Sequence, residues 1–423
     1  MNRCRGLAIA LVAALLLPAS AFAQKNEDND YTEDAGKLIG VAMLQQDTAQ
    51  RNQYYRDALV ALQEGMQEEP DNARIWFIAG QAHAGLHHFE EADAAFDKVV
   101  ELFPDLAADV DAEREAGWLE GFQAGVALMD ADQNEQAIAV LQASHELYPH
   151  RPEGLLNIGS IYANQGQTDQ AIEAFEQAIV AARGPHLEKL DSTGQAQWAH
   201  FAEMAEMNIA QMTGAAGVEN FQQGNYDEAA AAFTKAAEIN PYSRDYLFNI
   251  VQAHYAKAQD LEEQRDSTAE PGSAPQDQEL IQIYQALGPE IEKVREFDPN
   301  NETLLYILAR SERRLGELSG NEEAGQQKAL AALRQLEALP VEVQELIITP
   351  GEQQVAIEGK VKNRTLEPGS PVTIQITLLG STGEPIGETT ATATAGAKDE
   401  IATFQATADI TAQLAGWKYQ VAN

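Results

Sequence analysis

The sequence predicts a mainly α protein, an α-solenoid of stacked helix pairs followed by a small all-β domain, an antiparallel β-sandwich. Two observations predict this fold class. Small and large apolar residues return at a fixed interval through most of the chain, which indicates repeats that stack on one another. From Val341 onward the apolar residues instead alternate with polar ones, as half-buried strands require.

The interval is clearest between two neighbouring copies. Gly125 and Gly159 lie 34 residues apart, and so do Ala137 and Ala171. Further copies of the second helix occupy residues 89–96 and 226–233. Small residues let two antiparallel helices approach closely, and large residues fill the space between them. Each pair leaves an apolar face that only the next pair can cover, so we expect an array of pairs over residues 36–340.

In this pattern the chain resembles the tetratricopeptide repeat family, which has a large residue, a Leu-Gly pair and an aromatic on the first helix. The second helix of that family has Ala and Phe one turn apart, then a small residue, then Pro. One copy matches at Trp76, Ala79, Gly80, His83, Ala92, Phe96, Val99 and Pro104, and another at Leu155, Ile158, Gly159, Tyr162, Ala171, Phe175 and Ala178. The resemblance implies a scaffold that binds a protein or peptide.

Weaker copies flank these two. Residues 36–72 have a poor first helix, and residues 244–301 are interrupted by a stretch of loop composition that we expect to be a flexible insertion at 263–277. Residues 304–315 and 328–339 form a final pair. Two more insertions, 107–117 and 186–209, keep helical apolar spacing and are expected to lengthen their helices.

The β-domain is expected over residues 341–423, with turn signals between six or seven short strands. The run from Gly359 to Asn363, the strand from Val372 to Leu379, and Gly383, Phe404 and Tyr419 resemble the FxLYD-type sandwich of bacterial envelope proteins. The turn after Leu379 reads Gly-Ser-Thr-Gly, where that family has an aromatic followed by Asp. The resemblance implies no chemistry.

The N-terminus has the composition of a secretory signal peptide over residues 1–23. Arg3 and Arg5 precede an apolar run, and small residues place the cleavage between Ala23 and Gln24. We therefore expect a periplasmic protein without direct membrane insertion. Residues 24–35 are rich in Asp, Glu and Asn, and we expect a disordered acidic tail there.

Charge limits the classes of partner. The chain has 66 acidic and 28 basic residues, a formal net charge of −38. Such a field repels nucleic acid and favours a protein or peptide with basic flanks. The alternative is that the acidic residues form only a dispersed, solubilising surface, or an adaptation to salt.

No chemical motif stands out. Residues 130–135 begin like a calcium loop but lack its glycine and its final glutamate, so an inter-helix turn is expected. His83, His87 and His88 cluster, but a packed His83 beside an exposed pair is the simpler interpretation. We expect no catalytic residue, no metal and no cofactor, and predict that the protein is not an enzyme.

The resemblance also implies a concave groove lined by the first helix of each pair. Carried over position by position, the partner-binding groove would comprise Phe77, Gln81, Phe122, Val126, Leu156, Ser160, Phe248, Gln252, Tyr306 and Arg310. The Lys, Asn and Arg clamp that some relatives use on a terminal carboxylate is missing. The alternative for these side chains is that the long inserted helices cover them. Two alternative functions also stay open: a structural subunit of an envelope complex that uses its convex face or β-domain, and an enzyme or small-ligand binder.

Overall fold

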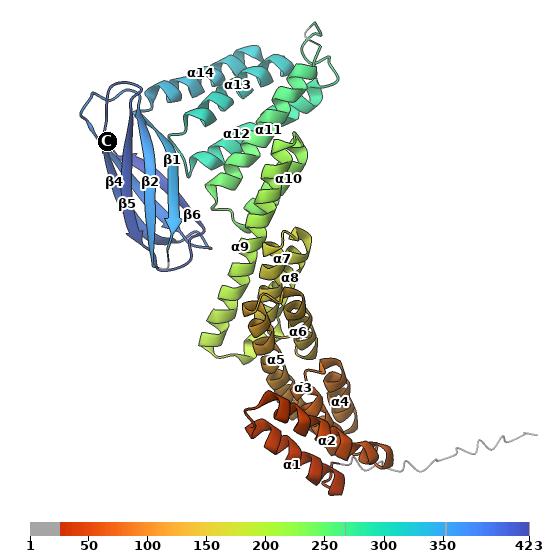
Figure 1. The fold of residues 1–423 in the computed structure, drawn as a ribbon. Helices are drawn as coiled ribbons and strands as arrows, with labels where there is room; N and C mark the ends of the chain where they lie inside the picture. The colour runs from red at the N-terminus through yellow and green to blue at the C-terminus, as the bar shows by residue number, and fades with distance from the viewer. Residues whose placement is uncertain (1–25, 267, 352, 423) are drawn as a thin grey trace, which may run out of the picture. The chain divides into compact units, whose positions relative to one another are not determined.

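A computed structural model describes residues 26–266, 268–351 and 353–422 (Figure 1). The chain divides into two compact units, one up to Phe201 and one from Ala202 onward. The expected signal peptide and its cleavage site lie outside the described residues. The predicted fold class, a helical array followed by antiparallel sheets, is confirmed.

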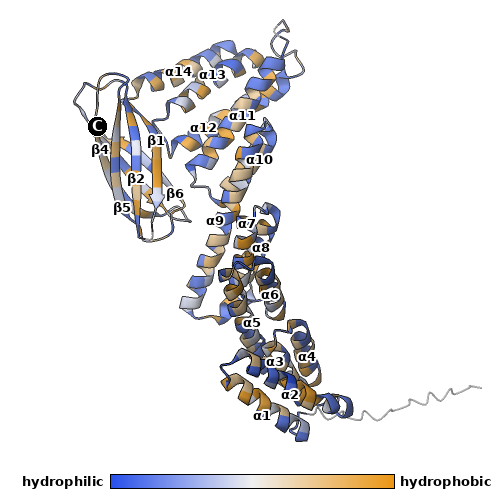
Figure 2. Ribbon diagram, in the orientation of Figure 1, coloured by the Kyte–Doolittle hydropathy of each residue, from blue (hydrophilic) through white to orange (hydrophobic). Residues whose placement is uncertain are grey.

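The first unit consists of antiparallel helix pairs. Each odd-numbered helix packs on the helix that follows it, and neighbouring pairs pack on one another. Apolar and polar residues are interspersed along the helices, as the mixture of orange and blue in Figure 2 shows. They are α1 (Asp30–Leu44), α2 (Thr48–Glu68), α3 (Ala73–Gly85), α4 (Phe89–Leu102), α5 (Ala107–Asp130), α6 (Asn134–Leu147), α7 (Glu153–Asn164) and α8 (Thr168–Ala182), with short 3-10 turns at Pro104–Leu106 and Pro185–Lys189.

Close approach of backbone and aromatic ring explains why glycine returns in the repeat. A Cβ added at Gly80 would lie 2.5 Å from the ring of Phe96, a distance that real contacts do not reach. The same relation links Gly159 to Phe175 at 2.6 Å. In the second unit it links Gly217 to Phe233 at 2.7 Å. The recurring glycine is therefore needed for packing, because any side chain there would push the paired helices apart.

The acidic stretch that was expected to be disordered is in fact helical from Asp30 onward. Asn29 caps α1 through a reciprocal pair of hydrogen bonds with Thr32. Ala35 and Ile39 are buried on the face of α1 that packs against α2. The expectation failed because acidic residues in a first turn stabilise a helix N-terminus, and their number alone does not predict disorder.

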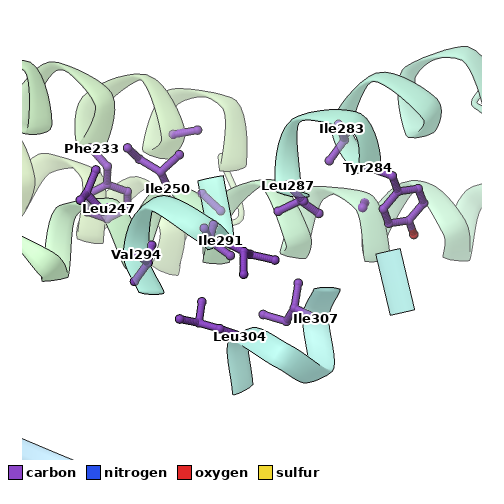
Figure 3. Close-up of a cluster of buried hydrophobic side chains, with 14 of the residues drawn as sticks. Phe233, Leu247, Ile250, Ile283, Tyr284, Leu287, Ile291, Val294, Leu304 and Ile307 are labelled. Atoms are coloured by element: carbon purple, nitrogen blue, oxygen red, sulfur yellow. The ribbon is translucent and has the colours of Figure 1, made fainter. Parts of the chain in front are cut away.

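The second unit begins within α9 (Ser192–Gln222). It continues through α10 (Tyr226–Ile239), α11 (Arg244–Gln264), α12 (Asp277–Arg295), α13 (Glu302–Ser319) and α14 (Glu322–Ala338). Consecutive helices from α10 to α14 pack on one another. Those from α10 to α13 share one core, in which Leu287, Ile291 and Leu304 are fully buried (Figure 3). No helix in the described part of the chain is both long and apolar enough to span a bilayer.

The insertion expected at 263–277 joins α11 to α12. Its two ends are tied together, because Arg265 Nε donates to Asp277 Oδ1 at 2.6 Å and the Asp277 side chain is 1% exposed. Asp277 Oδ2 also accepts from the backbone N–H of Ala274 at 2.9 Å. The base of this loop is therefore a closed, hydrogen-bonded clasp.

The β-domain is a sandwich of two three-stranded antiparallel sheets, ordered β1-β2-β5 and β4-β3-β6. Residues on β2 and β3 alternate between buried and more exposed positions, as predicted, and the buried residues of the sandwich form a separate apolar core. The strands are β1 (Val341–Pro350), β2 (Gln354–Asn363), β3 (Pro371–Leu379), β4 (Pro385–Thr394), β5 (Ile401–Asp409) and β6 (Gly416–Ala422).

A buried polar cluster holds the sandwich to the helices of the second unit. The Asp298 side chain, 4% exposed, accepts from Tyr419 Oη at 2.6 Å and from Arg244 Nε at 3.0 Å. Tyr419 Oη in turn accepts from the backbone N–H of Asn300, and Asn300 Nδ2 donates to the carbonyl of Val341. These bonds join the α12–α13 turn to strands β6 and β1, so the sandwich is part of this unit and not a loosely tethered module.

Candidate partner-binding surface

Two of the predicted groove residues lie on α3, where α5 covers them. The Phe77 side chain is 9% exposed and packs edge-on against Phe96, with the ring centroids 6.3 Å apart. Gln81 Nε2 donates to Glu113 Oε1 at 2.8 Å, and Glu113 lies on the N-terminal extension of α5. The structure thus places Phe77 in the core, because the inserted residues that lengthen α5 pack over the position that the family pattern leaves open.

The remaining predicted residues of the first unit form no exposed apolar row. Phe122 is half-buried and stacks on Trp118, and Val126 is also half-buried. Leu156 is buried. Ser160 is exposed, with its Oγ donating to the carbonyl of Leu156 at 2.8 Å. An aromatic side chain at a groove position can bury part of its ring against a neighbour on its own helix, as Phe122 does against Trp118.

The second unit brings three of its four predicted residues together. Gln252 on α11 and Tyr306 and Arg310 on α13 line two adjoining hollows, and Tyr306 belongs to both. The fourth, Phe248, is half-buried beneath the guanidinium of Arg244, which lies 4.5 Å from the ring centroid. Tyr306 is 60% exposed, the most exposed aromatic among the described large apolar side chains.

The first hollow, here called the sandwich hollow, has a volume of about 350 Å³. The helices and the sandwich build it jointly, since α11 and α13 form one wall and strands β1 and β2 form the other. Its lining residues are Gln252, Tyr255, Glu302, Thr303, Tyr306, Ile307, Glu342, Gln344 and Lys362.

Charges in the sandwich hollow are largely compensated. Lys362 Nζ lies 3.6 Å from Glu302 and 3.4 Å from Glu342, and Glu302 also pairs with Arg364. Burial and then the neighbouring Glu302 raise the pKa of Glu342, although hydrogen bonding to Gln344 and the charge of Lys362 act the other way. What this hollow offers a ligand is therefore mainly amide and hydroxyl groups beside an aromatic wall.

The second hollow, here called the arginine hollow, has a volume of about 500 Å³. It lies between α11, α13 and α14. Its lining residues are Glu262, Tyr306, Ala309, Arg310, Arg313, Arg314, Ala329 and Leu333.

One arginine of this hollow is fixed by a half-buried carboxylate. Arg314 Nε donates to Glu262 Oε1 at 2.6 Å, and Tyr284 Oη donates to the same oxygen at 2.7 Å. Burial disfavours the Glu262 carboxylate, but the bonds from Arg314 and Tyr284 and the charge of Arg310 outweigh it, so the pKa of Glu262 is lowered. Arg314 and Glu262 thus act as a structural pair.

The other two arginines face solvent. The Arg310 side chain is 44% exposed and lies 3.7 Å from Glu262, beyond the distance of a good hydrogen bond. Its guanidinium sits 5.8 Å from the centroid of the Tyr255 ring. The Arg313 side chain is 60% exposed and pairs with Glu317 at 3.2 Å across one helical turn. Both guanidinium groups therefore keep donors that can turn toward a ligand.

The sequence reasoning missed Arg313, Arg314, Glu262 and the residues that the sandwich contributes. A signal for the arginines is present, since positions 310, 313 and 314 have the spacing of one helix face and are unusual in so acidic a chain. No sequence signal could have found Gln344 or Lys362, because their place depends on how the sandwich packs on the helices.

The candidate metal positions are parts of inter-helix turns. Asp130 ends α5, and Asp132 has a left-handed backbone with φ of 56° just before α6. His87 has φ of 58° in the turn between α3 and α4. Burial lowers the pKa of His83, which favours its neutral form. Within the described ranges no three such side chains are grouped suitably to hold a metal ion.

Comparison with known proteins identifies the repeats. Two tetratricopeptide repeat family models match the chain, one at residues 128–190 and the other at residues 47–107 and 215–273. Among curated proteins, a search finds no match.

Several solved structures are similar to parts of the chain. MamA from Desulfovibrio magneticus RS-1 is 19% identical, covers 50% of this chain and 96% of its own, and has a TM-score of 0.20. The C-terminal part of a TPR repeat-containing protein from Cytophaga hutchinsonii is 16% identical, covers 73% and 95%, and has a TM-score of 0.23. A thermophilic TPR protein from Thermus thermophilus is 19% identical, covers 52% and 98%, and has a TM-score of 0.19.

Proposed function

We propose that this chain, which contains tetratricopeptide repeats, is an exported, non-enzymatic scaffold that binds a segment of another protein across Tyr306. The surface involved consists of the sandwich hollow, Tyr306 and the arginine hollow. One observation carries the proposal: the exposed ring of Tyr306 stands between two hollows that together run from the sandwich to α14.

Such a ring is suited to anchor a protein segment. Tyrosine brings a large apolar area with little rotamer entropy to lose, and its hydroxyl still finds a partner when the ring is covered. Leu333, 36% exposed at the far side of the arginine hollow, extends the apolar contact. A ligand the size of one residue would fill only one of the hollows, whereas an extended segment lying over Tyr306 would contact both.

The location proposed is the bacterial periplasm, supported by the composition of residues 1–23 and by a chain whose one cysteine, Cys4, lies in that stretch. The FxLYD-like features of the sandwich agree with an envelope protein. The net charge of −38 would steer a partner whose flanks are basic toward the protein and raise its association rate.

The test is affinity capture from a periplasmic extract with Tyr306→Glu and a matched control, Ile401→Glu. Ile401 lies on β5 and is 52% exposed, so both changes place a charge at an exposed apolar position of the same unit. Loss of a captured protein with Tyr306→Glu alone, at unchanged helicity by circular dichroism, is the expected result. Equal capture by wild type and the Tyr306 variant would reject the surface.

A second candidate is a structural subunit that assembles through its sandwich. Ile347 on β1 and Ile401 on β5, which are 56% and 52% exposed on the β1-β2-β5 sheet, favour it. The same experiment separates the two functions, because assembly through this sheet predicts that Ile401→Glu, and not Tyr306→Glu, loses the captured protein.

A further inference from the structure

We propose that the arginine hollow binds carboxylate side chains of the partner, so that the segment lying over Tyr306 is acidic. This inference rests on the proposed function and adds the chemistry of the occupant to it. The occupant is then a protein segment in which an apolar residue, placed on Tyr306, is followed by one or more Asp or Glu residues.

The charge of this hollow is opposite to that of the chain. The protein has 28 basic and 66 acidic residues, yet Arg310, Arg313 and Arg314 fall within five positions and all line one hollow. Glu262 is the one acidic side chain of the lining, and Arg314 and Tyr284 already satisfy it. Glu317, just outside the lining, pairs with both Arg313 and Arg314. Three guanidinium groups therefore face two carboxylates, and the hollow keeps an excess of one positive charge.

The two exposed arginines can release their present contacts at little cost. The pair between Arg313 and Glu317 is a surface pair of helix neighbours, and such pairs contribute about 0.3–0.5 kcal/mol. Arg310 is only loosely associated with Glu262, at 3.7 Å. A carboxylate in the hollow would replace these contacts with charge-assisted hydrogen bonds, which are shorter and stronger, and a guanidinium can make two of them to one carboxylate.

The fixed neighbours hold the arginines ready for a ligand. Arg314 is tied to Glu262, and the Tyr255 ring lies beside the Arg310 guanidinium. Preorganised donors lose less entropy on binding than freely rotating ones. A lysine of a partner would instead meet three guanidinium groups in this hollow, and that unfavourable contact would select against a basic residue at this place.

Apolar groups border the charged part. Tyr306 forms one side of the hollow, and Ala329 and Leu333 of α14 form another. A segment must therefore present carboxylates and an apolar side chain close together. Nucleic acid would also offer anions, but its closely spaced phosphates would have to approach a chain of net charge −38.

The probes are three short, blocked, fluorescent peptides of one length, with glutamate, glutamine or lysine residues around a central leucine. Fluorescence anisotropy with the full chain measures their affinities. The net charge of −38 attracts the lysine peptide and repels the glutamate peptide. We nevertheless expect the glutamate peptide to bind about tenfold or more tightly than either of the other two, because the arginines lie at the site itself. Because the whole protein repels anionic peptides, a preference for glutamate can only come from a local site.

Arg310→Gln combined with Arg313→Gln should remove the preference, and Lys328→Gln is the matched control. Lys328 is an exposed cation on α14, 64% exposed, that lines neither hollow. The inference is overturned if glutamine or lysine peptides bind as well as the glutamate peptide, if no peptide binds, or if the arginine variant keeps the preference. Capture that depends on Tyr306 would still stand in each of these cases, so the two proposals fail separately.

Discussion

Replacing Tyr419 with Phe should loosen the attachment of the sandwich to the helices. The change keeps the volume and the ring, which stacks near Trp417, and removes only the hydroxyl. That hydroxyl donates to the buried carboxylate of Asp298 at 2.6 Å and accepts from the N–H of Asn300 at 3.3 Å.

The magnitude follows from these two bonds. A hydrogen bond to a charged group contributes about 1.5–3 kcal/mol, and a buried N–H without an acceptor costs about 1 kcal/mol more. In the variant, Asp298 keeps its hydrogen bonds from Arg244 and Asn301, so we do not add the full cost of an unpaired buried carboxylate. We therefore expect a loss of about 2–4 kcal/mol in the free energy of opening this interface.

Hydrogen–deuterium exchange read by mass spectrometry is the suitable assay. A loss of about 2–4 kcal/mol corresponds to roughly 30–900-fold faster exchange for amides around residues 296–301 and in β6. Tyr242→Phe is the control, because its hydroxyl donates to the carbonyl of Thr382 at 2.9 Å in an exposed place between the same two parts. Unchanged exchange in Tyr419→Phe, or an equal effect in Tyr242→Phe, would refute the reasoning.

The same contact predicts the response to alkaline pH. Burial, and then the charge of Asp298, raise the pKa of Tyr419 well above its ordinary value of 10.0. A raised pKa in the folded state gives stability that is present below the unfolded value and is lost as the pH rises above about 10. In Tyr419→Phe this part of the alkaline loss should be absent, and an identical alkaline profile would contradict the assignment.

Three further outcomes are expected. Gly159→Ala should lower the free energy of unfolding by about 1–3 kcal/mol, because the added Cβ would clash with Phe175. Gly40→Ala should raise the free energy of unfolding by about 0.5–1 kcal/mol, because the space around Gly40 is open. Thermal melts of the two variants test both values. The hydrogen bond from Arg265 lowers the pKa of Asp277. The clasp should therefore be intact above pH 3.8 and open as the pH falls further, because Asp277 then becomes protonated. Proteolysis of the loop with an acid protease measures this opening. Asp277→Asn should expose the same loop to proteolysis at neutral pH, and a resistant variant would show that the clasp is not what protects it.

The fold class could be predicted because each copy of the repeat reflects the packing of two neighbouring helices. Gly159 and Phe175 must return together wherever two helices cross closely, so the interval in the sequence reports the packing directly. The alternation of apolar and polar residues predicted the strands from Val341, because it too reports directly which side chains face the core. The start of α1, from Asp30 to Ala35, was expected to be disordered because its acidic composition outweighed the capping signal of Asn29.

The candidate site could be predicted only in part. Gln252, Tyr306 and Arg310 line the two hollows in the structure, but the burial of Phe77 depends on the length of α5, a tertiary effect that repeat positions do not encode. The same holds for the wall that the sandwich provides, since Asp298 and Tyr419 fix it across 121 residues of sequence. Long-range polar contacts of this kind produce no periodic pattern in the sequence.

The central claim, that a partner segment lies over Tyr306, is tested most directly by site-specific photo-crosslinking. A photoreactive phenylalanine analogue at position 306 in the full chain, and the same analogue at position 401, would be irradiated in periplasmic extract and the products sequenced by mass spectrometry. We expect one defined acidic segment attached at position 306 and absent at position 401. Products at position 401 alone, or the same mixture at both positions, would contradict it.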